Sequence, residues 1–409
     1  MKISFKLLNF FELSFLCIYT LIMKKKICVI IHSRANYGSV KSVIKNIKKS
    51  KFLQLQLIVG GSALLDRFGS VVDLIRKDGF KVDKTVNFLI EGNSPMVMAK
   101  STGLAILEIT NSLSELKPDI VLTVGDRYET ISTAISATYM NIPLAHTMGG
   151  EISGTIDESV RHAVTKFSNI HFAATKNAKK NIIKMGENKK NVFDVGCPRV
   201  DEVKEILKNK ISNNQLSKNI NSSGVGYKID IKKPYIAVMY YPVTSEYGKG
   251  EIQIKNILKA INKFDIQKIF FWPNSDAGYE DISRGVRKWR EQNKDKKTRF
   301  IKNLEQKYFY HMLNKAKCLI GNTSSGLREG CYIGLTNICV GTRQNGREIG
   351  KNTTRINNEY KIIYKTLKRI LNSKIQNKID YKYGFGNSGK KIVKILEKIK
   401  VNSQKKLAY

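Results

Sequence analysis

The stretch with the clearest chemical character lies at residues 321–330, which read Gly-Asn-Thr-Ser-Ser-Gly-Leu-Arg-Glu-Gly. Small side chains let a phosphate approach the backbone, and the free N–H groups at the start of a helix attract an anion. Glu329 follows one turn later, where its carboxylate can accept hydrogen bonds from a diol such as ribose. Phosphate beside diol suggests a nucleotide, although an ordinary strand–turn–helix with small packing residues would contain the same run.

Strand-like and helix-like stretches alternate along the chain, which predicts βα units and parallel sheets. In the first half, the apolar runs typical of strands are residues 27–31, 55–59, 80–82, 120–124, 144–146 and 171–175. In the second half they are residues 235–240, 268–272, 299–301, 318–320 and 337–340. Polar turns follow these runs, and open α/β sheets bind ligands at the carboxyl ends of strands. We therefore predict an α/β protein with two Rossmann-like domains and a cleft between them.

Domain boundaries follow from a change in composition. Residues 208–231 are rich in Asn, Ser, Lys and Gly and poor in apolar residues, as linkers are. We predict a first domain over residues 23–205, a linker over residues 206–231, a nucleotide-binding domain over residues 232–385, and a C-terminal helix with a basic tail over residues 386–409.

The first 22 residues form an apolar extension about as long as a signal or anchor helix. Lys2, Lys6 and Glu12 interrupt it, and no small-residue cleavage site closes it. Met23 directly precedes a basic triplet and the first strand, which is how many cytoplasmic α/β enzymes begin. We expect Met23 to be the true start of a cytoplasmic protein, with a membrane anchor at residues 1–22 as the alternative.

The chain is strongly basic, with 71 Lys and Arg against 34 Asp and Glu and a net charge of +37. Such a charge attracts nucleic acid, anionic membrane surfaces or anionic small molecules. The Lys residues are scattered, and aromatic residues are not interleaved with them as in a stacking surface. We expect a solvated basic surface and no specific nucleic-acid partner. The six Cys form no CxxC pair, which indicates a reducing compartment without disulfides or a zinc site.

Seven motifs, in order along the chain, together resemble one family. They are residues 125–129, 146–162, 196–198, 242–246, 271–278, 321–330 and 341–348. The set resembles the hydrolysing UDP-N-acetylglucosamine 2-epimerases, in the branch that feeds sialic and legionaminic acid synthesis, over about residues 24–400. The resemblance implies a glycosyltransferase-B-like fold with the active site between the domains. It implies no metal or redox cofactor, and a homodimer is common among such relatives.

The activity that this resemblance implies is hydrolysis with inversion at C2 of the sugar. UDP leaves by elimination across C1–C2, a 2-acetamidoglucal forms, and water then adds to release an N-acetylmannosamine-type sugar. The substrate is UDP-N-acetylglucosamine or a UDP-linked 2,4-diacetamido relative such as UDP-N,N′-diacetylbacillosamine. No residue in the sequence distinguishes these sugars, and the nucleotide base is open as well.

Elimination needs a base for the C2 proton, and hydration needs both an acid and a base. The resemblance places Asp126 and Asp157 at positions that the family uses for acid–base or orienting roles, and Glu151 belongs to the Gly-Gly-Glu signature of this branch. His146 and Arg161 lie on either side of that signature and complete the expected catalytic set. A helix cap, a surface turn or a core histidine is the alternative at each position taken alone.

The departing diphosphate needs fixed positive charge and hydrogen-bond donors. The substrate-binding residues we expect are Arg34, Tyr241, Asn274, Ser324, Ser325, Gly326, Glu329 and Arg343. Arg347 is a further candidate for the diphosphate, although an Arg on a surface turn is more often solvated.

Three residues depart from the family pattern. Tyr241 stands where this branch usually has His, and tyrosine can donate a hydrogen bond but carries no positive charge at neutral pH. Asn36 replaces a common Asp, and Met148 replaces a polar residue before Gly-Gly. Two other functions remain open: a glycosyltransferase of the same fold, which would not need the Gly-Gly-Glu set, and a basic nucleic-acid-binding protein with salt-dependent affinity.

Overall fold

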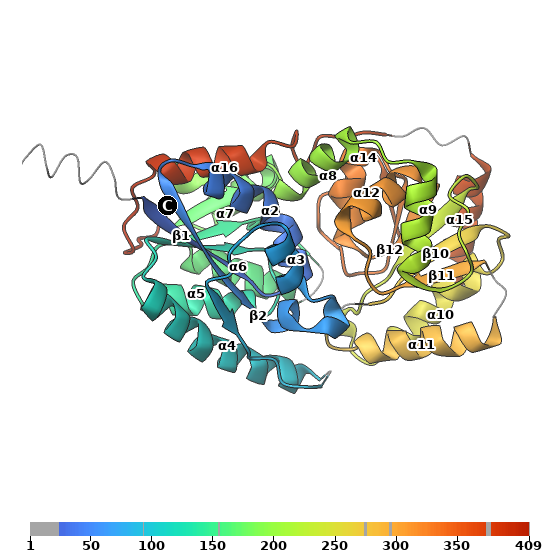
Figure 1. Cartoon of the computed structure of the whole chain (residues 1–409). Helices are drawn as coiled ribbons and strands as arrows, with labels where there is room; N and C mark the ends of the chain where they lie inside the picture. The colour runs from blue at the N-terminus through green and yellow to red at the C-terminus, as the bar shows by residue number, and fades with distance from the viewer. Residues whose placement is uncertain are drawn as a thin grey trace, which may run out of the picture.

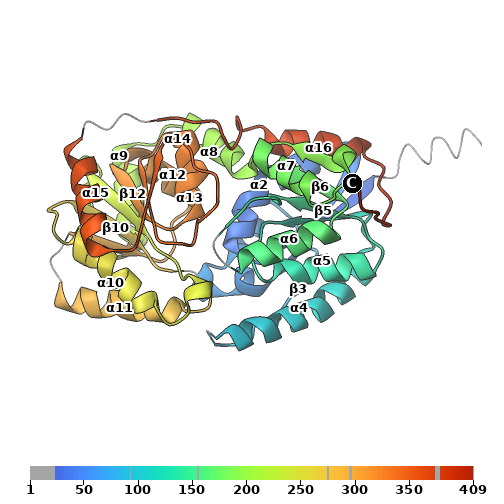
Figure 2. The same ribbon diagram turned by 180° about the vertical axis from the view of Figure 1, so that it is seen from behind.

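The computed structural model describes residues 24–92, 94–153, 156–273, 276–293, 297–373 and 378–408. Over these ranges the chain forms two α/β domains that lie side by side, each with helices on both faces of a seven-stranded sheet (Figures 1 and 2). The predicted fold class, α/β with two Rossmann-like domains, is therefore confirmed. The predicted N-terminal extension lies outside the described residues.

The first sheet has the order β3-β2-β1-β4-β5-β6-β7, and every neighbouring pair is parallel. Its strands are β1 (Lys25–Ile31), β2 (Leu53–Gly60), β3 (Lys84–Val86), β4 (Ile120–Val124), β5 (Leu144–Thr147), β6 (Ile170–Ala173) and β7 (Val192–Asp194). The helices that connect them are α2 (Arg34–Lys49), α3 (Val71–Lys77), α4 (Pro95–Leu116), α5 (Thr130–Tyr139), α6 (Asp157–Phe167) and α7 (Lys176–Lys184). The order reverses between β1 and β4, which is where such sheets bind ligands.

The second sheet has the order β14-β13-β12-β9-β10-β11-β8, parallel except for the edge strand β8. Its strands are β8 (Gly224–Gly226), β9 (Tyr235–Met239), β10 (Gln267–Phe271), β11 (Thr298–Ile301), β12 (Cys318–Gly321), β13 (Asn337–Val340) and β14 (Thr353–Ile356). Its helices are α9 (Asn213–Ser222), α10 (Gly250–Ile261), α11 (Tyr279–Gln292), α12 (Gln306–Lys315), α13 (Ser324–Leu327), α14 (Glu329–Ile333) and α15 (Tyr360–Asn372). Short 3-10 turns are η1 (Gly61–Leu64), η2 (Asp66–Phe68), η3 (Lys189–Asn191) and η4 (Thr244–Glu246).

Side-chain alternation along the central strands divides each core into two layers. In β9, Ile236 and Val238 face the layer formed with α10, α11 and α15, while Ala237 and Met239 face the layer formed with α9, α12 and α14. Successive side chains of a strand point to opposite faces, so a continuous apolar run is buried on both sides. This is why the central strands could be located as unbroken apolar runs. The edge strands β3, β7, β8 and β14 could not: the prediction of a strand at residues 80–82 is wrong, because β3 is Lys84–Val86, and the other three were not predicted.

The segment predicted as a linker, residues 206–231, is largely regular structure. It contains the end of α8 (Pro198–Lys208), the whole of α9 and the edge strand β8. Ser212 caps α9 by accepting a hydrogen bond from the Gln215 amide, and Leu216 and Ile220 are buried in the second domain. The apolar content is low because a helix that buries one narrow stripe needs only two apolar residues four apart.

The last helix, α16 (Ser388–Lys398), returns to the first domain, where it packs against α2 (Figures 1 and 2). Ile392 and Leu396 are fully buried in the core of that domain. The Lys25 ammonium donates to the carbonyls of Leu396 at 2.8 Å and Ile399 at 2.9 Å, which joins the helix to the start of β1. The chain therefore passes between the domains twice, through α8 and through the segment before α16.

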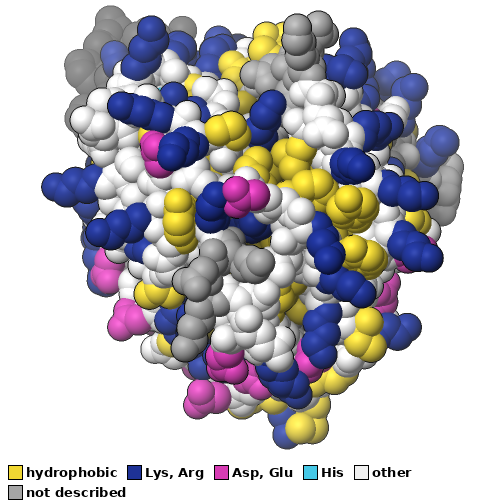
Figure 3. Space-filling view, turned by 90° about the vertical axis from the view of Figure 1, so that its right-hand side faces the viewer, with side chains coloured by type: hydrophobic (Ala, Val, Ile, Leu, Met, Phe, Trp, Pro, Cys, Tyr) yellow, Lys and Arg dark blue, Asp and Glu magenta, His cyan; other side chains and the backbone are white. Residues whose placement is uncertain are grey.

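On the face that Figure 3 presents, Lys and Arg side chains are spread across the surface rather than gathered into one stripe. In the described ranges, the five cysteines are buried and unpaired. The same ranges contain no helix that is long and apolar enough to cross a membrane.

Candidate active site

A cavity of about 300 Å³ lies between the two domains, at the carboxyl ends of the central strands of both sheets. The first domain contributes the start of α2 and the turn after β4. From the second domain come Tyr241 after β9, Trp272 after β10 and Ser324 after β12. Both sheets therefore direct their strand ends into one space, as the sequence predicts.

The structure brings most of the predicted site residues to this cavity. Those that line it are Arg34, Asp126, Asp157, Tyr241, Ser324, Ser325, Glu329 and Arg343. Four others, His146, Glu151, Arg161 and Gly326, lie behind its wall. Asn274 lies outside the described residues.

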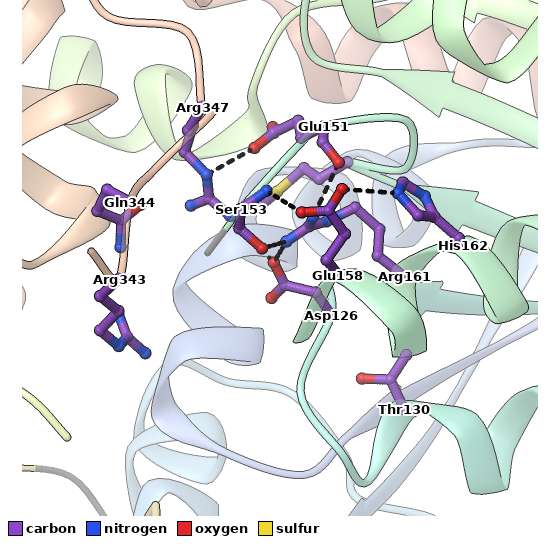
Figure 4. Close-up of polar contacts among 12 residues, drawn as sticks. Asp126, Thr130, Glu151, Ser153, Glu158, Arg161, His162, Arg343, Gln344 and Arg347 are labelled. Atoms are coloured by element: carbon purple, nitrogen blue, oxygen red, sulfur yellow. Dashed lines mark hydrogen bonds and ion pairs between the residues drawn. The ribbon is translucent and has the colours of Figure 1, made fainter. Parts of the chain in front are cut away.

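Asp126 is held between arginines from both domains. The fully buried Arg161 of α6 pairs with its Oδ2, and Arg347 Nη2 of the second domain lies 3.1 Å from the same oxygen (Figure 4). Burial by itself raises the pKa of Asp126, but Arg161, Arg347 and Arg328 outweigh burial and hold this pKa well below its usual range. Asp126 is therefore ionised at any working pH, so it can orient or stabilise but does not supply a proton.

Glu151 lies behind Asp126 and is enclosed by guanidinium groups. Its Oε2 is 2.6 Å from Arg328 Nη2 and 3.3 Å from Arg347 Nε, and its carbonyl accepts from Arg161 Nη1 at 2.8 Å. Burial raises the pKa of Glu151, but Arg328, Arg347 and Arg161 together lower it below the ordinary value. The carboxylate is thus a fixed negative charge that does not face the cavity.

Asp157, the first residue of α6, is half-buried in the cavity wall. Burial, followed by the charge of Asp126, raises the pKa of Asp157 to about 6, and Arg343 only partly opposes them. Two carboxylates of one cavity thus have pKa values pushed apart in opposite directions. In enzymes, a split of this kind separates a fixed negative charge from a group that exchanges its proton near neutral pH.

His146 supports the turn that carries Asp126. Its Nε2 lies 2.8 Å from the Gly125 carbonyl oxygen and its Nδ1 lies 3.4 Å from Thr165 Oγ1. Burial lowers the pKa of His146 to about 4, so the ring is neutral. His146 is fully buried, as expected of a core histidine, which was the alternative to a catalytic role. Farther along α6, His162 Nε2 lies 3.2 Å from Glu158 Oε1 (Figure 4).

Residues 321–330, the stretch whose small side chains suggest a nucleotide site, begin at the end of β12 and form the turn into α13. Ser324 and Ser325 open α13 on the cavity wall, and Thr323 caps the helix by accepting from the Ser325 amide. Gly326 has a packing role, because a Cβ there would lie 2.3 Å from Asn337 Oδ1. Glu329 is buried, with Oε1 2.7 Å from Arg199 Nη1, while its Oε2 has no hydrogen-bond partner in the described part of the chain.

Tyr241 and Arg343 meet on the same wall of the cavity. The Arg343 guanidinium lies over the Tyr241 ring, 5.6 Å from its centroid, and Arg343 Nε donates to the Pro242 carbonyl at 3.2 Å. Burial raises the pKa of Tyr241, so the phenol is neutral and can donate a hydrogen bond. Arg34 reaches across from the first domain and donates to the Leu304 carbonyl.

Three arginines that line the cavity were not among the site residues predicted from the sequence. Arg127 spans the domains to Asp276 at 2.7 Å, Arg199 holds Glu329, and Arg328 holds Glu151. Each stands within or directly after one of the quoted motifs, so its position was a usable signal. Their partners were not predictable, because these pairs join residues at least 130 positions apart.

The fold is glycosyltransferase-B-like, and its cavity has the Asp126 and Asp157 carboxylates on one domain and the turn at Ser324 on the other. A family model described as UDP-N-acetylglucosamine 2-epimerase matches residues 45–397, and the chain belongs to that family of nucleotide-sugar 2-epimerases.

Relatives of known name are similar over most of their length. The chain is 33% identical over 384 residues to the UDP-N,N′-diacetylbacillosamine 2-epimerase (hydrolyzing) of Legionella pneumophila, covering 93% of this chain and 98% of that protein. It is 32% identical over 330 residues to the polysialic acid biosynthesis protein P7 of Escherichia coli, covering 80% and 81%. The UDP-GlcNAc 2-epimerase of Neisseria meningitidis bound to UDP-GlcNAc has the same fold, with a TM-score of 0.77 at 18% identity over 91% of this chain and 100% of that chain.

Proposed function

We propose that this protein is a hydrolysing 2-epimerase. It converts UDP-N-acetylglucosamine, or a UDP-linked 2,4-diacetamido relative, to UDP and the free manno-configured sugar used in sialic- or legionaminic-type synthesis. The observation that carries the proposal is the pair Asp126 and Asp157, whose pKa values are pushed apart in a cavity that also carries a nucleotide-type turn. Relatives that are named as hydrolysing 2-epimerases, at 33% and 32% identity, support the same reaction type.

In the first step, Asp157 takes the proton from C2 of the sugar. The C2–H electron pair forms the C1=C2 bond, and the C1–O bond breaks with its electrons passing to UDP. Arg34 and Arg343, which approach from opposite domains, stabilise the charge that develops on the diphosphate. The product of this step is a 2-acetamidoglucal together with UDP.

In the second step, water adds across C1=C2 with the opposite stereochemistry at C2. The new C2–H bond takes its proton from an acid on the other face of the ring, while a base accepts a proton from the water that attacks C1. Protonated Asp157, left by the first step, releases its proton to solvent or to the departing diphosphate and is ionised again, and ionised Asp126 orients the attacking water. Elimination and hydration are redox-neutral overall, so the proposed reaction balances without a redox cofactor.

The nucleotide half of the substrate would lie against the second domain. Ser324 and Ser325 face the phosphates, Tyr241 donates a hydrogen bond in place of a charged side chain, and Glu329 accepts from the ribose. Asn274 stays a prediction, as do the homodimer and the cytoplasmic location.

The direct test incubates the protein with a panel of UDP-N-acetylglucosamine, UDP-N,N′-diacetylbacillosamine and their GDP analogues. We expect UDP and a manno-configured sugar from at least one UDP substrate, and deuterium at C2 of the product when the reaction runs in D₂O. Absence of nucleotide release from the whole panel would sink the proposal. Release only after an acceptor alcohol is added would identify a glycosyltransferase instead.

Replacing Glu329 with glutamine should weaken UDP binding by about tenfold, because a hydrogen bond to a charged acceptor contributes about 1.5 kcal/mol or more. Its Oε1 is occupied by Arg199, whereas Oε2 is buried without a hydrogen-bond partner in the described ranges. Isothermal titration with UDP and with 2′-deoxy-UDP measures the effect. The ribose role predicts that the variant loses less affinity for the deoxy ligand; equal losses for both ligands would contradict it.

A further inference from the structure

A serine hydroxyl lies beside the ionised carboxylate of the cavity. Ser153 follows the Gly-Gly-Glu turn by two residues and lines the cavity, as Asp126 and Asp157 do. It is only 8% exposed, so nearly all of its surface is covered by protein. No step of the proposed reaction uses the hydroxyl, which makes it a polar group of the cavity without an assigned role.

The guanidinium that holds Asp126 also fixes the Ser153 hydroxyl. Arg161 Nη2 donates to Ser153 Oγ at 3.1 Å and pairs with Asp126 Oδ2 (Figure 4). Arg161 is fully buried behind the cavity wall, so it reaches both oxygens from the side away from the cavity. Because the two oxygens contact one nitrogen, they are less than two hydrogen-bond lengths apart, a span that a single water molecule can bridge.

The main chain of Ser153 is fixed as well. Its N–H donates to Glu158 Oε2 at 2.8 Å, and two residues earlier the Glu151 carbonyl accepts from Arg161 Nη1 at 2.8 Å (Figure 4). Glu158 follows Asp157 in the first turn of α6, so Ser153 is tied to the turn that carries the proposed base. A group held in this way presents its hydroxyl in one place, as a positioned reactant requires.

The hydroxyl keeps a proton to donate. A serine hydroxyl has one proton and two lone pairs, and Arg161 occupies one lone pair. Within the described ranges, the hydrogen bonds of Ser153 use its N–H and this lone pair, and none uses the proton. Donation from the guanidinium polarises the hydroxyl and makes it a stronger donor. The proton is therefore available to a molecule in the cavity beside Asp126.

We propose that Ser153 is a further catalytic residue, which holds the attacking water of the hydration step together with Asp126. The water accepts a hydrogen bond from the Ser153 hydroxyl and donates one to the Asp126 carboxylate, which leaves one lone pair of the water oxygen to form the bond to C1. The C1=C2 electron pair takes up a proton at C2, and the water gives up one proton to a base, so the sum is the addition of one water molecule. The inference rests on the proposed function, because it concerns the second step of that reaction.

Ser153→Ala tests the assignment through the products, because elimination does not use this water. The rate of UDP release should stay within about threefold of the parent rate. The ratio of released 2-acetamidoglucal to manno-configured sugar should rise about tenfold, the effect of losing one hydrogen bond to the reacting molecule. Proton NMR of the reaction mixture distinguishes the glycal by its vinylic hydrogen, and a coupled assay follows UDP.

Two variants serve as controls. Ser153→Thr keeps a hydroxyl and should keep the parent product ratio. Ser112→Ala removes another buried serine hydroxyl, which donates to the Glu108 carbonyl at 3.0 Å within α4, and should change neither rate nor ratio. If Ser153 served only as an acceptor for Arg161, its loss would disturb Asp126 and slow UDP release, while the product ratio would stay at the parent value.

Supplying 2-acetamidoglucal together with UDP measures the second step by itself. The parent should convert the glycal to the manno-configured sugar, and Ser153→Ala should do so about tenfold more slowly. Equal hydration by the parent and Ser153→Ala, or an equal loss in Ser153→Thr, would overturn the inference.

The two assays separate this inference from the proposed function. If the parent releases UDP from a nucleotide sugar and Ser153→Ala gives the parent products at the parent rate, the inference fails and the function stands. If the parent releases no UDP from any nucleotide sugar but hydrates the glycal in a Ser153-dependent way, the proposed function fails and the inference stands. A parent protein that carries out neither step refutes both.

Discussion

Asp157→Asn should lower kcat by about 10²–10⁴-fold, the usual contribution of a positioned acid or base. The amide keeps the shape of the carboxylate but does not carry a proton between substrate and water. Because Asp157 lies at the start of α6 rather than in the nucleotide-type turn, the Kd for UDP should change by less than about threefold. Coupled detection of UDP release, with titration of UDP in parallel, measures both quantities.

The pH profile tests the same assignment independently. Asp157 has a pKa raised to about 6, and a base acts only when ionised, so kcat/KM should fall as the pH falls through about 6. Asp126 stays ionised near pH 6, because its pKa is held well below its usual range, so it does not contribute to this fall in kcat/KM. The residual kcat/KM of Asp157→Asn should not show this fall near pH 6. Asp281→Asn in the first turn of α11 is the matched control and should keep both rate and profile; persistence of the fall in Asp157→Asn would refute the role.

Gly321→Ala should destabilise the second domain by about 3 kcal/mol or more, because backbone strain and a steric clash add at this position. Gly321 ends β12 with a φ of 147°, and a Cβ there would lie 1.9 Å from the Met239 carbonyl oxygen of β9. The backbone has to move, and the turn that begins with Asn322 moves with it. Urea unfolding should show a lower midpoint, and UDP affinity should fall as well.

Gly103→Ala provides the matched comparison. Gly103 lies in the exposed part of α4, and no atom lies within 4 Å of an added Cβ. Alanine there should stabilise the protein by about 0.5–1 kcal/mol through its better helix propensity. The interpretation of Gly321 would be wrong if both substitutions shifted the midpoint equally.

The positions of the strands and of the main acidic residues were predictable from local patterns. Unbroken apolar runs identified the central strands because both of their faces are buried, whereas the edge strands β3, β7, β8 and β14 were misplaced or missed. The polar turns after the central strands identified the cavity because parallel strands share one carboxyl edge. Asp126, Asp157 and Ser324 follow this logic and line the cavity.

What was not predictable depends on contacts between distant segments. Glu151 has the same local context as Asp126, yet two arginines from the other domain surround it behind the cavity wall. Helix α9 was missed because its burial rests on only two apolar side chains. The position of α16 also depends on tertiary packing, since an amphipathic helix does not specify which domain covers its apolar face.

The return of α16 has a consequence for biosynthesis. The core of the first domain includes Ile392 and Leu396, so this domain stays incomplete until the ribosome has made the entire second domain and the helix beyond it. Vectorial folding, in which the first domain matures before the next is translated, is therefore interrupted here. Because Lys25 binds the C-terminal end of α16, a circularly permuted gene that begins with this helix would encode the first domain as one uninterrupted segment.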